Sequence, residues 1–244
     1  MSGGGESAVR IALVFPELLG TYGDGGNAVV LAQRLRWRGL PAEIVRVGMD
    51  DPLPHGCDIY VLGGGEDAPQ TFATARLVET GLARAVDFGA TVFAVCAGLQ
   101  VLGESFTGSD GHQQPGLGIV DCTTRPKGVR QIGELVVEST AFDLPLLTGF
   151  ENHGGVTEVG PGATPLGRVK VGHGNGAGGV DGVVSGRVLG TYLHGPALAR
   201  NPALADLLLS WVTGAALDPI DEPLIDRLRS ERLKAALGGR GGRG

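Results

Sequence analysis

The chain has 244 residues, 42% of them hydrophobic and 19% charged, which is enough to bury a sizeable core in one large or two small domains. Its formal net charge of −6 at pH 7 gives no basic surface for nucleic acid. No apolar run approaches the roughly 18 residues of a membrane span, and no secretory signal opens the sequence. We therefore expect a cytoplasmic protein without a transmembrane segment.

The cysteines and the chain ends indicate which cross-links and domain boundaries to expect. The three cysteines, Cys57, Cys96 and Cys122, are odd in number and widely spaced, with no CxxC pair, so neither a disulfide framework nor a zinc site is expected. Both ends are rich in glycine. We expect a flexible N-terminus at residues 1–8, a single domain over 9–237 and a disordered Gly/Arg tail at 238–244.

Apolar strand patterns alternate with helical patterns in the first half of the chain. Helices are expected at 28–38 and 71–88. Strands are expected at 10–15, 42–47, 58–62 and 91–95. This alternation predicts βαβ units and a parallel sheet with right-handed crossovers, in which ligands bind at the carboxyl ends of the strands.

The second half consists mostly of short strand-like runs separated by Gly, Pro and Asp. These runs lie at 117–123, 133–139, 149–152, 166–171 and 183–188. A final strand from residue 188 ends at His194, and helices are expected at 201–212 and 220–237. The predicted fold class is α/β, with a central, mostly parallel sheet flanked by helices and an added antiparallel section.

Cys96 follows the buried strand pattern 91–95 and precedes a helix-compatible segment. Strand, sharp turn and helix form the layout of a nucleophile elbow, and the small residues Ala94, Ala97 and Gly98 suit its crowded turn. The amides and dipole at the helix N-terminus favour a thiolate there. An inert buried thiol is the alternative that this stretch alone leaves open.

A cysteine nucleophile needs a base and donors for the oxyanion. His194, at the end of an apolar strand, is the candidate base, although a hydrogen-bonded core histidine fits the same position. His153 is a further residue that can face the site. The amide of Ala97 and the glycine loop 63–65 are candidate oxyanion donors, but a phosphate loop or a plain turn also fits this triplet. No GxxxxGK[ST] sequence is present, so no ATP site of that kind is expected.

Motifs in order along the chain carry a resemblance to a known family. The segments FAVCAGLQVLG (93–103) and GTYLHG (190–195) resemble class I, triad-type glutamine amidotransferases of the cobyric acid synthase-like branch. The segments YGDGGN (22–27), GGGED (63–67) and GFENHGG (149–155) narrow the resemblance to the GatD family, the glutaminase subunits of lipid II isoglutaminyl synthases. The resemblance extends from about residue 11 to 201.

The resemblance implies a role for each matching residue. Cys96 attacks the side-chain amide of L-glutamine, and His194 acts first as base and then as acid. Backbone amides of Gly64, Gly65 and Ala97 hold the oxyanion. Arg130 binds the α-carboxylate of glutamine, which suits a planar guanidinium, although a solvated loop arginine is the alternative. Gln100 is a further expected substrate contact.

One position departs from the usual triad. Most triad-type amidotransferases carry a glutamate two residues after the histidine, and here that residue is Pro196. The resemblance therefore implies that a partner, a MurT-type synthetase similar to Mur ligases, supplies an aspartate. ATP and Mg²⁺ are expected on that partner and no cofactor in this chain. Low glutaminase activity without the partner is expected, and the Asp24 loop is a candidate part of the interface.

The function implied is a glutaminase subunit that passes ammonia to an ATP-dependent ligase. The ligase would amidate the α-carboxylate of D-glutamate in lipid II to D-isoglutamine, at the inner face of the membrane. A glutaminase serving another amidation, such as that of a corrinoid, is one alternative. A stand-alone cysteine hydrolase and a scaffold without catalytic activity are others.

Overall fold

A six-stranded sheet forms the centre of the computed structural model, which describes residues 7–108 and 111–238. Its strands, in spatial order, are β11 (Val183–Ser185), β12 (Val188–Thr191), β4 (Thr91–Val95), β3 (Ile59–Leu62), β1 (Val9–Val14) and β2 (Ala42–Val47). All neighbours pair in parallel except β11 with β12. The central strands β3 and β4 are buried along their whole length and almost entirely apolar, because helices cover both faces of the sheet.

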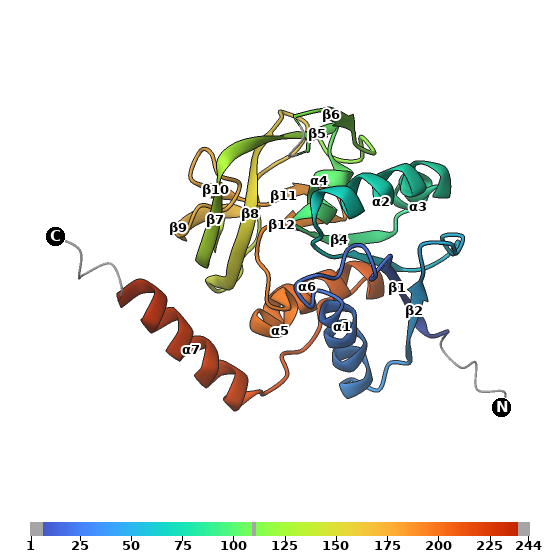
Figure 1. Cartoon of the computed structure of the whole chain (residues 1–244). Coiled ribbons are helices and arrows are strands. Elements are labelled where there is room, and N and C mark those ends of the chain that lie inside the picture. Colours follow the sequence, from blue (N-terminus) through green and yellow to red (C-terminus); the bar gives the residue numbers. More distant parts are fainter. Residues whose placement is uncertain (1–6, 109–110, 239–244) are drawn as a thin grey trace.

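Helices cover the sheet on both sides (Figure 1). One face carries α1 (Gly26–Trp37), α5 (Ala197–Arg200) and α6 (Pro202–Thr213), and the other carries α2 (Asp67–Thr80), α3 (Leu82–Asp87) and α4 (Ala97–Leu102). The single helix predicted over 71–88 is thus two helices. Gly81 separates them in a left-handed conformation, with φ of +80°, which glycine adopts without steric cost.

A second sheet, built mainly of antiparallel pairs, is the predicted added section. Its order is β10-β9-β7-β5-β6, and β8 pairs with β7. The strands are β5 (Ser105–Thr107), β6 (Gln113–Pro115), β7 (Cys122–Ser139), β8 (Leu147–Val159), β9 (Gly167–Val171) and β10 (Val180–Asp181). The short runs predicted here merge into a long β7–β8 hairpin, because the pairing continues past a register shift between Pro126 and Gln131. The run predicted at 183–188 is instead the β11–β12 hairpin.

The last helix, α7 (Pro223–Gly238), lies along the outside of the molecule and has no buried residue (Figure 1). None of the helices in the described ranges has the length and apolar content that crossing a membrane requires. The predictions of a flexible N-terminus and a disordered tail fall mostly on residues 1–6 and 239–244, outside the described residues.

Candidate active site

Cys96 lies between β4 and α4 in the conformation expected of a nucleophile elbow. Its φ of +52° and ψ of −109° are unusual for a residue other than glycine, and its amide donates to the Thr191 carbonyl at 2.9 Å. Small neighbours are needed because α4 packs closely on β3. A Cβ at Gly98 would lie 2.9 Å from both the Cβ and the carbonyl oxygen of Leu62. This packing fixes the thiol at the carboxyl edge of the sheet.

The thiol of Cys96 is neutral at pH 7 in this structure. Burial, and to a smaller extent the nearby Asp24 carboxylate, raise the pKa of Cys96 to about 12 against the opposing effect of the Ala97 amide. The amide at the N-terminus of α4 favours the thiolate, as the sequence predicts, but burial outweighs this effect. Helix α4 spans only six residues, and its effect is smaller than the cost of desolvation. The cysteine needs a base to become nucleophilic.

His194 is oriented by a carboxylate of the same chain. Its Nδ1 lies 3.0 Å from Oδ2 of Asp24, and both side chains are fully buried. Because a carboxylate only accepts hydrogen bonds, Nδ1 is the donor of this bond, and in the neutral imidazole the lone pair then lies on Nε2. The imidazole stacks on Phe150 and contacts the edge of Tyr22, with ring centroids 5.2 and 4.7 Å away. The ring is thus held in the tautomer that a general base requires.

Asp24 corrects the expectation that this chain lacks its own third member. The residue lies in the loop between β1 and α1, far in sequence from His194, and the sequence had suggested this loop only as a candidate part of the partner interface. Oδ2 of Asp24 also accepts the Gly64 amide at 2.9 Å. From the sequence, Asp24 could have been identified as an acidic residue in the loop that follows the carboxyl end of the first predicted strand.

The topology brings His194 and Cys96 to the same edge of the sheet. Strands β12 and β4 are adjacent and parallel, with Thr191 paired to Val95. His194 follows β12 and bridges Phe150 of β8, which ties the second sheet to this edge. Within the described part of the chain, Nε2 of His194 is buried and has no hydrogen-bond partner. An unpartnered imidazole nitrogen and a thiol that follow two neighbouring parallel strands give the components that proton abstraction requires.

Two of the three predicted oxyanion donors remain available. The Ala97 amide faces the sulfur of Cys96 and lowers its pKa, and Gly65 lies in the wall of the cavity at Cys96. The amide of Gly64 is already donated to Asp24, so Gly64 does not serve as a free donor here. Its contribution is to stabilise the buried carboxylate that orients His194.

A cavity of about 300 Å³ opens at Cys96 between the two sheets. The predicted substrate residues Gln100 and Arg130 both line it. Gln100 donates to the Tyr192 hydroxyl and accepts from Gln70, each at 3.0 Å, so its amide is held in one orientation. Arg130 donates to Oδ1 of Asn152 at 2.5 Å and to the hydroxyl of Tyr22 at 2.6 Å. The volume suits a single amino acid.

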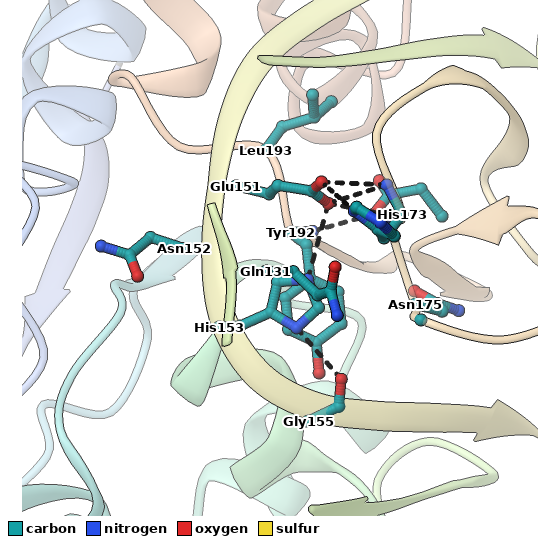
Figure 2. A network of polar contacts seen from close by, with 12 residues as sticks. Gln131, Glu151, Asn152, His153, Gly155, His173, Asn175, Tyr192 and Leu193 are labelled. Atoms are coloured by element: carbon teal, nitrogen blue, oxygen red, sulfur yellow. Dashed lines mark hydrogen bonds and ion pairs between the residues drawn. The ribbon is translucent and has the colours of Figure 1, made fainter. Parts of the chain in front are cut away.

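His153 supports the cavity wall through a buried polar network (Figure 2). Its Nδ1 donates to the Gly155 carbonyl at 3.0 Å, its Nε2 lies 3.6 Å from the carboxylate of Glu151, and its ring packs on Tyr192. Glu151 also accepts hydrogen bonds from the backbone and ring of His173. Burial alone would raise the pKa of Glu151, but these hydrogen bonds lower it. Among the described residues, Nδ1 of His153 is hydrogen-bonded in this network, whereas its buried Nε2 only approaches the Glu151 carboxylate and has no hydrogen-bond partner.

Over the residues that the structure describes, no cluster of three or more His, Cys, Asp or Glu side chains has an arrangement that could hold a metal ion.

Comparisons with known proteins agree with this geometry. Residues 10–202 match the model of the CobB/CobQ-like glutamine amidotransferase domain. The chain is 35% identical over 223 residues to the lipid II isoglutaminyl synthase (glutamine-hydrolyzing) subunit GatD of Staphylococcus aureus (strain N315), covering 90% of each chain. It is 32% identical over 207 residues to the subunit GatD of Streptococcus pneumoniae (strain ATCC BAA-255 / R6), covering 83% of this chain and 79% of that one.

Solved structures share the fold. A glutamine amidotransferase crystal structure aligns with a TM-score of 0.56 at 22% identity and covers 83% of this chain and 98% of the other. A chain in the structure of PurLQS from Thermotoga maritima aligns with a TM-score of 0.57 at 16% identity, covering 84% and 97%.

Proposed function

Because the chain belongs to the CobB/CobQ-like glutamine amidotransferase family, we propose that it is the glutamine-hydrolysing subunit of a lipid II isoglutaminyl synthase. The observation that carries the proposal is its 35% identity, over 90% of each chain, to a subunit of that name. The site supports this function because a nucleophile, a base and a cavity for one amino acid converge at one sheet edge.

The first half of the reaction forms a thioester. Nε2 of His194 takes the proton of the Cys96 thiol as the sulfur attacks the amide carbon of L-glutamine. The amides of Ala97 and Gly65 stabilise the oxyanion, and a donor of this kind contributes about 2.7–4 kcal/mol. Collapse of the intermediate breaks the C–N bond, and His194 returns the proton to the leaving nitrogen. Ammonia and a γ-glutamyl thioester result.

Water resolves the thioester in the second half. His194 again accepts a proton, from the attacking water, and the second tetrahedral intermediate expels the sulfur, which recovers the proton. The products are glutamate and the free thiol. Asp24 stabilises the imidazolium that forms in each half, as the carboxylate of a catalytic triad does.

The ammonia is destined for a synthetase partner in this proposal. A MurT-type subunit, similar to Mur ligases, would bind ATP and Mg²⁺ and activate the α-carboxylate of D-glutamate in lipid II. Ammonia would displace the activated group to give D-isoglutamine. Such a complex acts in the cytoplasm, at the inner face of the membrane that carries lipid II. We expect the free chain to hydrolyse glutamine slowly, because burial raises the pKa of its Cys96 thiol, and we expect the partner to increase the rate.

Co-expression with a MurT-type synthetase tests the proposal. The complex is expected to release glutamate from L-glutamine and to amidate lipid II in the presence of ATP, whereas Cys96→Ala abolishes both glutamine-dependent reactions. Added ammonium should restore lipid II amidation by the Cys96→Ala complex, because the synthetase site is intact. Glutamine hydrolysis without lipid II amidation would favour a different acceptor. Peptide hydrolysis without any partner would favour a stand-alone cysteine hydrolase.

A further inference from the structure

A cluster of four polar residues lies at the mouth of the Cys96 cavity. Tyr22, Glu66, Arg130 and Asn152 come from three separate parts of the chain and meet there. The hydroxyl of Tyr22 donates to Oε1 of Glu66 at 3.3 Å and accepts from Arg130 at 2.6 Å. Glu66 and Arg130 are 3.7 Å apart. Of these four residues, only Arg130 is expected from the sequence to bind the substrate, through its α-carboxylate, and the α-ammonium has no expected partner.

We propose that Glu66 binds the α-ammonium group of L-glutamine, beside the α-carboxylate held by Arg130. The head group of a free amino acid carries one positive and one negative charge. The cavity mouth offers one carboxylate and one guanidinium in complementary positions, and both line the cavity that contains Cys96. This inference rests on the proposed glutaminase function and extends it to substrate selection.

The present contact between Glu66 and Arg130 leaves room for such a substrate. At 3.7 Å the pair is longer than a direct charge-assisted hydrogen bond, and both side chains are about half exposed, at 56% and 46%. Arg130 uses Nε for Asn152 and Nη2 for Tyr22. Since a guanidinium has five N–H donors, it retains donors for a carboxylate. Tyr22 and Asn152 keep it in position while it does so.

The position of Glu66 also matches the reach of the substrate. Glu66 directly follows Gly65, whose amide is a proposed oxyanion donor, and it precedes α2. The charges of both Arg130 and Glu66 act on the sulfur of Cys96, in opposite directions. A glutamine bound with its amide at Cys96 therefore has its charged end between these two side chains.

The test compares two substrates in the complex with the synthetase partner. L-Glutamine carries the α-ammonium group, and 5-amino-5-oxopentanoate has the same amide and carboxylate without it. The variant Glu66→Gln should lower kcat/KM for L-glutamine by about 10- to 30-fold, mainly through KM, since one charge-assisted contact is lost. Hydrolysis of 5-amino-5-oxopentanoate should change by less than about twofold. Arg130→Met should impair both substrates.

The same pair of substrates separates this role from an indirect one. If Glu66 only positions Arg130, Glu66→Gln will lower the activity on both substrates equally, and the proposal is overturned. An unchanged KM for L-glutamine overturns it as well. Glu79→Gln, on the exposed side of α2, is the matched control and should leave both reactions unchanged.

A binding measurement tests the role of Glu66 independently of glutamine hydrolysis. Calorimetric titration of the Cys96→Ala complex should show L-glutamine binding more tightly than 5-amino-5-oxopentanoate, and Glu66→Gln should remove this difference. If the wild-type complex fails to release glutamate, the glutaminase function fails, and the titration still decides the role of Glu66. Equal binding of both compounds before the substitution excludes an ammonium subsite.

Discussion

At the scale of single residues, the site combines a thiol that resists deprotonation with a base that is locked in one tautomer. Cys96 is buried and neutral, and His194 presents a lone pair because Asp24 holds its other nitrogen. The thiol and the imidazole therefore depend on each other, and neither residue type alone would give a nucleophile at pH 7.

Asp24→Asn is expected to lower kcat for glutamine hydrolysis by roughly 10²- to 10⁴-fold with a small change in KM. An amide at this position can donate to Nδ1 of His194 and so favours the wrong tautomer, an effect that reaches about 10⁴-fold in a serine protease triad. Steady-state kinetics of the complex measure it. The thermal unfolding curve controls for misfolding, and a loss below about threefold would assign the orienting role to another carboxylate, such as one from the partner.

Alkylation of Cys96 by iodoacetamide should be slow at pH 7 in the free chain and should accelerate about tenfold per pH unit up to at least pH 10. The reason is that the thiolate is the reactive form and burial raises the pKa of Cys96 to about 12. Asp24→Asn removes the second cause of the shift and should speed the reaction at each pH. Mass spectrometry of the Cys96 peptide gives the rates. A plateau below pH 8 would reveal a stable thiolate and contradict the prediction.

The catalytic residues that stand in a recognisable local sequence pattern could be predicted from the sequence. The residue that orients the base, Asp24, stands in no such pattern and was missed. Cys96 was visible because a β-branched strand and small neighbours surround it, and His194 because it ends an apolar strand. Asp24 belongs to a loop rich in glycine, and its partner His194 lies 170 positions away in the sequence. Its role depends on two strand ends meeting, which no local pattern encodes. The predicted role for Gly64 failed for the same reason, since its amide bonds to Asp24.

At the scale of elements, the parallel sheet was predictable and the lengths of the later strands were not. Strands 42–47 and 91–95 have the predicted bounds because apolar runs there end at turn residues. In the second sheet, polar and glycine residues interrupt the apolar pattern within β7, yet β8 continues to supply hydrogen-bond partners on both sides of the irregular stretch. Tertiary pairing outweighs local propensity in these strands.

Arg34→Met should lower the free energy of unfolding by about 2–4 kcal/mol. Arg34 of α1 is 2% exposed and donates two hydrogen bonds of 2.7 Å to Asp206 of α6, and it also pairs with Glu222 just before α7. Loss of the guanidinium leaves two largely buried carboxylates with only Arg38 to compensate. Urea denaturation at pH 7 measures the change.

An exposed ion pair provides the matched control for this substitution. Arg227 pairs with Glu231 on the surface of α7, where its side chain is 76% exposed, and Arg227→Gln should change the stability by less than about 0.5 kcal/mol. A similarly small effect for Arg34→Met would show that the cluster does not hold α1, α6 and the start of α7 together.

At the scale of the whole molecule, the cavity exists because the second sheet folds over the carboxyl edge of the first. Cys96 and Gln100 come from the first sheet and its helix α4, whereas Arg130 and Asn152 come from the β7–β8 hairpin. The bridge between Phe150 and His194 joins the two parts. The sequence indicated that an antiparallel section existed, but the site depends on where that section lies, which is set by contacts distant in sequence.

Ile132→Asp should weaken binding of the synthetase partner by at least about tenfold without changing the stability of the free chain. Ile132 lies on β7 opposite Asn152, beside the cavity mouth, and it is 70% exposed, which is unusual for a large apolar side chain. In the proposed complex the partner covers this mouth to receive the ammonia, and a buried charge at such an interface is costly. Calorimetric titration with the partner measures the affinity.

Phe88→Asp is the matched control for this substitution. Phe88 is 79% exposed and lies near the amino ends of β3 and β4. Equal losses of affinity for the two variants would contradict the prediction and indicate a general surface defect. A loss of affinity confined to Phe88→Asp would place the partner at the opposite edge of the sheet, away from the cysteine.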